Sequence, residues 1–113
     1  MRLRDGNTIP TPKDGYPYLM DSDGNVTAEP DLLTWARAFE KMDRRIAADE
    51  AGPSKVSTVF LGVDHQWGDG PPLIFETLVF GGPLEGEMDR YSTRAEALAG
   101  HAAMLARVKA SLN

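Results

Sequence analysis

The chain of 113 residues contains no cysteine, no long apolar run and fewer basic than acidic side chains. The lack of cysteine excludes disulfides and thiolate zinc sites, and it suits a reducing compartment. No apolar run could span a bilayer, and the opening residues MRLRDGNTIP lack the apolar region of a signal peptide. A formal net charge of −5 disfavours a binder of nucleic-acid polymers, which needs a surface that neutralises phosphates. We therefore expect a cytoplasmic protein whose partners include neither a membrane nor a nucleic-acid polymer.

An apolar fraction of 42% is enough for one modest core, and the length fits a single domain over residues 1–113. Residues 1–30 are rich in turn signals, because Asp-Gly recurs three times in them. The segment DSDGN resembles the start of a calcium loop, but the sixth and twelfth positions hold Val26 and Leu32 instead of Gly and an acidic ligand. The sequence therefore predicts a turn there, flanked by the short extended segments YPYLM and NVTA.

A helix of roughly five turns is predicted to begin after Asp31 and to end at Gly52-Pro53. Its apolar residues are spaced three and four apart, as on one face of a helix: Leu32, Trp35, Phe39, Met42 and Ile46. Such a stripe packs into the core of the chain or against a second subunit.

Residues 56–64 and 73–80 have the composition of strands, and the segment DHQWGDGPP between them predicts a wide hairpin loop. Gly62 within the first strand indicates a bulge or a close approach of another backbone or a ligand. Trp67 has no obvious place to be buried, so we expect its environment to change when a ligand binds.

A second helix is predicted after RYSTR (90–94), because Thr93 and Glu96 have the spacing of a capping box. Its apolar stripe contains His101 together with Leu98, Leu105, Val108 and Leu112. Gly100 in the middle of this helix indicates that another group packs closely there. The predicted fold class is α+β: a turn-rich segment 1–30, then a helix-strand-strand-helix core over 31–113 whose small antiparallel sheet is a central wide hairpin between two main helices.

The acidic and histidine side chains could form a metal or acid-base site: Asp64, His65, Asp69, Glu76 and His101. Asp64 and His65 are adjacent, so a regular strand would direct them to opposite faces. No metal-binding helix spacing and no nucleophile elbow occur. We therefore predict no catalytic residue, no metal and no cofactor, with His101 a satisfied core or interface histidine and Glu76 paired with an arginine or with backbone donors.

RYSTR is the better candidate for a ligand site. A helix that starts at Ser92 or Thr93 would present free backbone N–H groups and the positive end of its dipole to an anion. Arg90 and Arg94 could grip a phosphate, and Tyr91 could stack on a base. The alternative is an ordinary capped helix with solvated arginines.

The segment STVFLGVDHQWGDGPPLIFETLVFGG, followed by RYSTRAEALAGH, resembles a family of small phage and prophage proteins over residues 56–101. That family is similar to the phage anti-Thoeris sponges, which sequester cyclic ADP-ribose isomers used as alarm signals by bacterial defence systems. The resemblance implies oligomers of dimers in the host cytoplasm that bind such signals, and in some members cyclic oligonucleotides, without cleaving them.

The resemblance and the residue chemistry together give one set of candidate ligand-binding residues: His65, Trp67, Phe75, Thr77, Arg90, Tyr91, Thr93 and Arg94. The chain departs from the family pattern at Gln66-Trp67 and at Arg94. A different hypothesis is a phage accessory protein that blocks a host enzyme by direct protein contact. A nucleotide-sized pocket lined by RYSTR would favour sequestration, whereas a flat apolar patch would favour protein contact.

Overall fold

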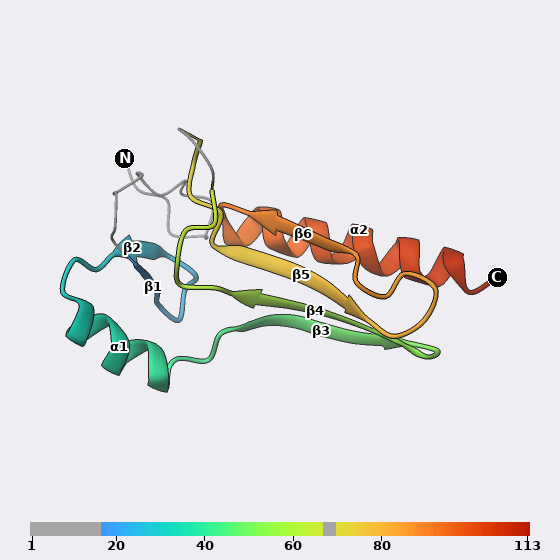
Figure 1. The fold of residues 1–113 in the computed structure, drawn as a ribbon, viewed down its shortest axis with the longest axis horizontal. Helices are drawn as coiled ribbons and strands as arrows, with labels where there is room; N and C mark the ends of the chain where they lie inside the picture. Colours follow the sequence, from blue (N-terminus) through green and yellow to red (C-terminus); the bar gives the residue numbers. More distant parts are fainter. Residues whose placement is uncertain (1–16, 67–69) are drawn as a thin grey trace.

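The computed structural model describes residues 17–66 and 70–113, and its fold is α+β, as predicted. A two-stranded antiparallel sheet pairs β1 (Tyr18–Met20) with β2 (Val26–Ala28). A four-stranded antiparallel sheet has the order β3 (Arg45–Ala51), β4 (Ser54–Phe60), β5 (Phe75–Phe80) and β6 (Met88–Tyr91). The two helices are α1 (Leu32–Lys41) and α2 (Arg94–Ser111). Figure 1 shows α2 lying along the larger sheet, with α1 and the β1–β2 hairpin at one end.

The predicted wide hairpin is the β4–β5 pair, whose register runs from Lys55↔Phe80 to Phe60↔Phe75. The first strand ends four residues earlier than predicted, at Phe60, because Gly62 turns the chain with φ +78°. The carbonyl of Gly62 accepts a hydrogen bond from the Tyr18 N–H at 2.8 Å. The predicted close approach of another backbone at Gly62 is therefore confirmed.

The prediction of a five-turn helix is correct for Leu32–Lys41 and wrong for the residues after Lys41. α1 ends at Lys41, and residues 45–51 form β3, which pairs with β4 through the turn at Gly52-Pro53. Spacing alone could not separate the two states, because Ile46 faces the core from a strand as it would from a helix. Pairing with β4 satisfies the backbone groups of this segment and decides in favour of the strand.

The sequence did not predict β6. GEMDRY was expected to be a connection, but Met88–Tyr91 pairs with β5 from Leu78↔Met88 to Phe75↔Tyr91. Arg90 and Tyr91 are therefore consecutive residues of an edge strand, and their side chains point to opposite faces of the sheet.

The capping box that begins α2 is confirmed. Thr93 Oγ1 accepts from the Glu96 N–H at 3.1 Å, and Glu96 Oε1 accepts from the Thr93 N–H at 3.1 Å. The buried face of α2 consists of Ala97, His101, Met104 and Val108. Leu98 and Leu112, which the sequence placed on the apolar stripe, are exposed.

Helix α2 covers one face of the larger sheet, where its residues pack against Val56 and Val79. At the end nearest the start of α2, a second cluster joins the β1–β2 hairpin to the sheet through Tyr18, Phe60 and Phe75. The alternate residues of all four strands form the opposite face, called here the open face, and none of them is buried: Arg45, Ala48, Glu50, Lys55, Ser57, Val59, Glu76, Leu78, Phe80, Met88 and Arg90.

Candidate functional site

The structure separates the two arginines of RYSTR. Arg90 lies on the open face, where its Nε donates to Glu76 Oε2 at 3.0 Å. The sequence predicted either an arginine or backbone donors as the partner of Glu76, and the structure has the arginine. Arg94 lies at the start of α2, and its side chain crosses the β1–β2 turn at Gly24, where a Cβ would come within 2.4 Å of its Cδ. The two guanidinium groups therefore do not form a joint phosphate grip.

The N-terminus of α2 already holds a carboxylate. Glu96 Oε1 accepts from the N–H groups of both Ser92 and Thr93, and Thr93 Oγ1 is used by the capping box. In the part of the chain that the structure describes, the N–H groups of Arg94 and Ala95 make no hydrogen bond. An anion at this terminus would have to approach these two donors beside the negative charge of Glu96.

Phe75 and Thr77, two more of the predicted residues, are completely buried on β5. Phe75 packs in the core, and its ring lies 5.2 Å from that of Phe60. Thr77 belongs to a hydrogen-bonded chain that the sequence analysis missed. Neither side chain is accessible to a ligand in this structure.

The hydrogen-bonded chain crosses the interface between the sheet and α2. Tyr91 donates its hydroxyl hydrogen to Thr77 Oγ1 at 3.1 Å, and the hydroxyl oxygens of Thr77 and Thr58 are 2.5 Å apart. Thr58 Oγ1 is 2.7 Å from His101 Nδ1, and His101 Nε2 is 2.7 Å from Asp49 Oδ2. With neutral His101, every hydroxyl and the imidazole can donate in one direction, from Tyr91 to Asp49.

This chain contains the Asp-His-hydroxyl order of a nucleophilic triad, but Thr58 is completely buried and cannot reach a substrate. His101 is a satisfied core histidine, as predicted. Burial raises the pKa of the Tyr91 hydroxyl above 10.0, and the nearby charge of Asp89 adds a smaller rise. The hydrogen bond to Thr77 lowers this pKa, but by less than burial raises it. Thr58 and Thr77 could have been found from sequence only with the register of β4 on β5, because they face each other across that pair.

The remaining predicted residues lie in the β4–β5 loop. His65 is half-buried, and its N–H donates to the Leu73 carbonyl at 3.0 Å. Asp64 Oδ1 accepts from the N–H groups of Gln66 and Leu73 and so closes the base of the loop. Trp67, with the change of environment predicted for it, lies outside the described residues.

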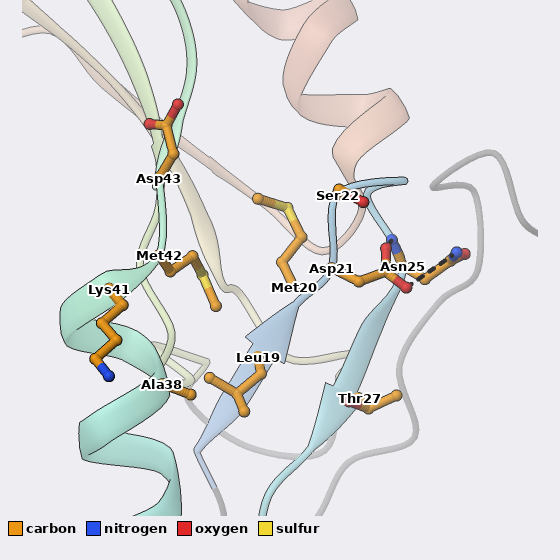
Figure 2. Close-up of a pocket in the computed structure, with 10 residues that line it drawn as sticks. All are labelled: Leu19, Met20, Asp21, Ser22, Asn25, Thr27, Ala38, Lys41, Met42 and Asp43. Atoms are coloured by element: carbon orange, nitrogen blue, oxygen red, sulfur yellow. Dashed lines mark hydrogen bonds between the residues drawn. The ribbon is translucent and has the colours of Figure 1, made fainter.

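A groove of about 510 Å³ lies between the β1–β2 hairpin and the C-terminal half of α1. It is lined by Leu19, Met20, Asp21, Ser22, Asn25, Thr27, Ala38, Lys41, Met42 and Asp43. Figure 2 shows the side chains of Leu19 and Met42 directed into the space between β1 and α1. Of the eight predicted ligand residues, the seven that the structure describes do not line this groove, although Arg94 touches the β1–β2 turn that forms one of its walls.

Comparison with known proteins found no match to any family model, to any curated protein or to any solved structure. Within residues 17–66 and 70–113, no group of three or more His, Asp or Glu side chains could hold a metal ion. Neither of the described helices is long and apolar enough to cross a membrane.

Proposed function

We propose that the protein is a non-catalytic sponge that sequesters a cyclic nucleotide signal of the cyclic ADP-ribose type in the groove between α1 and the β1–β2 hairpin. The observation that carries the proposal is the size of the groove, about 510 Å³, which lies within the usual range of small-molecule and cofactor sites. A sponge needs no reacting group, because it acts by mass action.

The lining of the groove suits the parts of a nucleotide other than its phosphates. Leu19, Ala38 and Met42 give an apolar surface against which a base can lie. Asp43 Oδ1 accepts from the Arg45 N–H at 3.1 Å, and its other oxygen is available to a ribose hydroxyl, which carboxylates bind well.

The phosphates of such a ligand would lie at the rim, away from the carboxylates of the groove. Two cations are available there: Lys41 on α1, and Arg94 across the β1–β2 turn. Neither forms an ion pair with another described residue. Both can therefore bind an anion without breaking an ion pair to any residue that the structure describes.

The test is calorimetric titration with a cyclic ADP-ribose isomer, using two alanines of α1 as a matched pair. Ala38 lines the groove, and Ala36 is exposed elsewhere on the same helix. Ala38→Trp should fill the groove and abolish binding, whereas Ala36→Trp should bind like the parent. If the parent does not bind the ligand, or if Ala38→Trp binds normally, the proposed site is wrong.

A second candidate function is the blocking of a host protein by direct contact. The observation that favours it is the open face, on which Phe80 is 50% exposed and Met88 is 43% exposed. An accessible apolar surface of this kind is typical of protein-binding faces.

A further inference from the structure

We propose that the open face of the four-stranded sheet is covered in solution by the open face of a second copy of this chain. The middle row of this face runs across all four strands as Ala48, Ser57, Leu78 and Met88, which are successive cross-strand partners. Phe80 lies next to this row on β5 and is half exposed. Together they form a nearly continuous surface without a charged side chain at the centre of the face.

The size of the open face fits a dimer interface. Strands about 4.8 Å apart with about 3.4 Å per residue give a face roughly 19 Å wide, about 20 Å long on β3, β4 and β5 and about 14 Å long on the shorter β6, or roughly 350 Å² in projection. Side-chain relief raises the accessible area above the projected one. A stable interface needs at least about 500 Å² from each partner, so nearly the whole face would have to be used. Face-to-face packing of two sheets, as in a β-sandwich, uses it in this way.

The charges of the open face favour a second copy over a strongly charged partner. The whole chain has a formal net charge of −5, so two copies repel each other over most of their surfaces. The open face instead carries three basic and two acidic side chains, all outside its middle row: Arg45, Lys55, Arg90, Glu50 and Glu76. Arg90 and Glu76 already neutralise each other within one chain. A mixed rim around an apolar centre is what a self-complementary surface requires.

The positions of the charges also select an orientation. Arg45 and Glu50 lie on β3, one on each side of the middle row. Arg45 is the cross-strand partner of Val59, and Glu50 is the partner of Lys55. A two-fold axis along the middle row would place Arg45 over Glu50 of the partner subunit, and Glu50 over Arg45 of the partner subunit. An axis parallel to the strands would instead bring Arg45 toward Arg90 of the partner subunit, which repulsion disfavours. The first arrangement is the one that we infer.

None of the open-face residues lines the groove. Dimerisation would therefore leave both grooves of the pair accessible, and the dimer and the ligand site can be tested independently. A dimer that does not bind nucleotide would refute the proposed function alone, and a monomer that does bind it would refute this inference alone.

The first experiment is sedimentation velocity across the micromolar range, with two glutamate substitutions as a matched pair. Phe80→Glu buries a carboxylate from each chain in the interface and should raise the dimer dissociation constant at least about a hundredfold. Leu32→Glu adds the same charge at a leucine that is 66% exposed on α1, off the open face, and should associate like the parent. Circular dichroism confirms that both variants fold.

The second experiment tests the orientation by charge exchange. Arg45→Glu and Glu50→Arg should each weaken the dimer, and the double variant should recover it, because the two charges would again be opposite. A parent chain that stays monomeric, or a dimer that survives Phe80→Glu, overturns the proposal. So does a monomer whose open face instead captures a host protein, which would support the second candidate function. Failure of the double variant to recover overturns the inferred axis.

Discussion

The side chain of Tyr91 occupies the place where a side chain on Gly100 would be. A Cβ built on Gly100 would lie 2.2 Å from the Tyr91 hydroxyl oxygen and 2.3 Å from two of its ring carbons. This contact fixes the distance between α2 and β6 at the point where Tyr91 donates to Thr77. It also explains a glycine in the middle of an 18-residue helix.

Gly100→Ala should therefore destabilise the protein, although alanine is the better helix former by about 1 kcal/mol. We expect a net loss of roughly 1–3 kcal/mol, because Tyr91 must move and the packed interface must open. Chemical denaturation measures this loss. In a Tyr91→Ala background the clash is absent, so the same substitution should become neutral or stabilising. An equal cost in both backgrounds would show that the contact is not the cause.

Removal of the Thr58 hydroxyl should be costly, because it leaves two buried partners unsatisfied. Thr58→Val keeps the shape of the side chain but deprives His101 Nδ1 and the Thr77 hydroxyl of their shared partner. We expect a loss of roughly 1–3 kcal/mol in the free energy of unfolding. Ser57 is one residue away on the open face, and its side chain makes no hydrogen bond to a described residue. Ser57→Ala should therefore have almost no effect on the free energy of unfolding. Similar effects of the two variants would argue against the chain of hydrogen bonds.

The raised pKa of Tyr91 predicts a loss of stability at high pH. The folded state holds the phenol proton more tightly than the unfolded state, whose pKa stays near 10.0. The stabilising contribution is therefore fully present below pH 10.0, and it is lost as the pH rises above 10.0 through the folded pKa. Urea denaturation at a series of pH values measures this fall.

The informative quantity is the difference in the free energy of unfolding between the parent and Tyr91→Phe, because every other ionisable group is common to both. We expect this difference to shrink above pH 10.0, since only the parent must lose a buried phenol proton. Two parallel stability curves would mean that Tyr91 ionises equally well in both states.

The two arginines of RYSTR give a prediction about ligand binding. Arg94 contacts the β1–β2 turn, whose residues Asp21, Ser22 and Asn25 line the groove. Arg90 is instead paired with Glu76 on the open face. Arg94→Ala should weaken binding of a cyclic ADP-ribose isomer by roughly tenfold or more, since a charged hydrogen bond contributes about 1.5–3 kcal/mol. Arg90→Ala should leave the affinity unchanged. Calorimetric titration compares them, and the reverse order would place the ligand on the open face.

Features that depend on residues close together in the chain were predictable from the sequence. The start of α2 was predictable because the capping box joins Thr93 to Glu96, three residues away. The β4–β5 hairpin was predictable because two β-branched and aromatic runs flank a loop rich in Gly and Pro. The close approaches at Gly62 and Gly100 were also indicated, since glycine at such positions has a backbone or packing reason.

Which segments pair, and which faces they present, depended on contacts between residues far apart in the chain. The spacing of Met42 and Ile46 fits a helix, but this segment pairs with β4 and is therefore the strand β3. The first pair, Arg45 with Val59, joins residues 14 positions apart in the sequence, and the later pairs are closer to the turn. The strand β6 was not predicted from the sequence for the same reason. Its four residues have mixed polarity, and they form a strand only through pairing with β5. Successive side chains of β6 point to opposite faces of the sheet, so Arg90 lies on the open face and Tyr91 faces α2. These two adjacent residues of RYSTR are therefore in different environments. The residue types of RYSTR predicted a single ligand site, but the alternation of side chains along β6 places Arg90 and Tyr91 on opposite faces of the sheet.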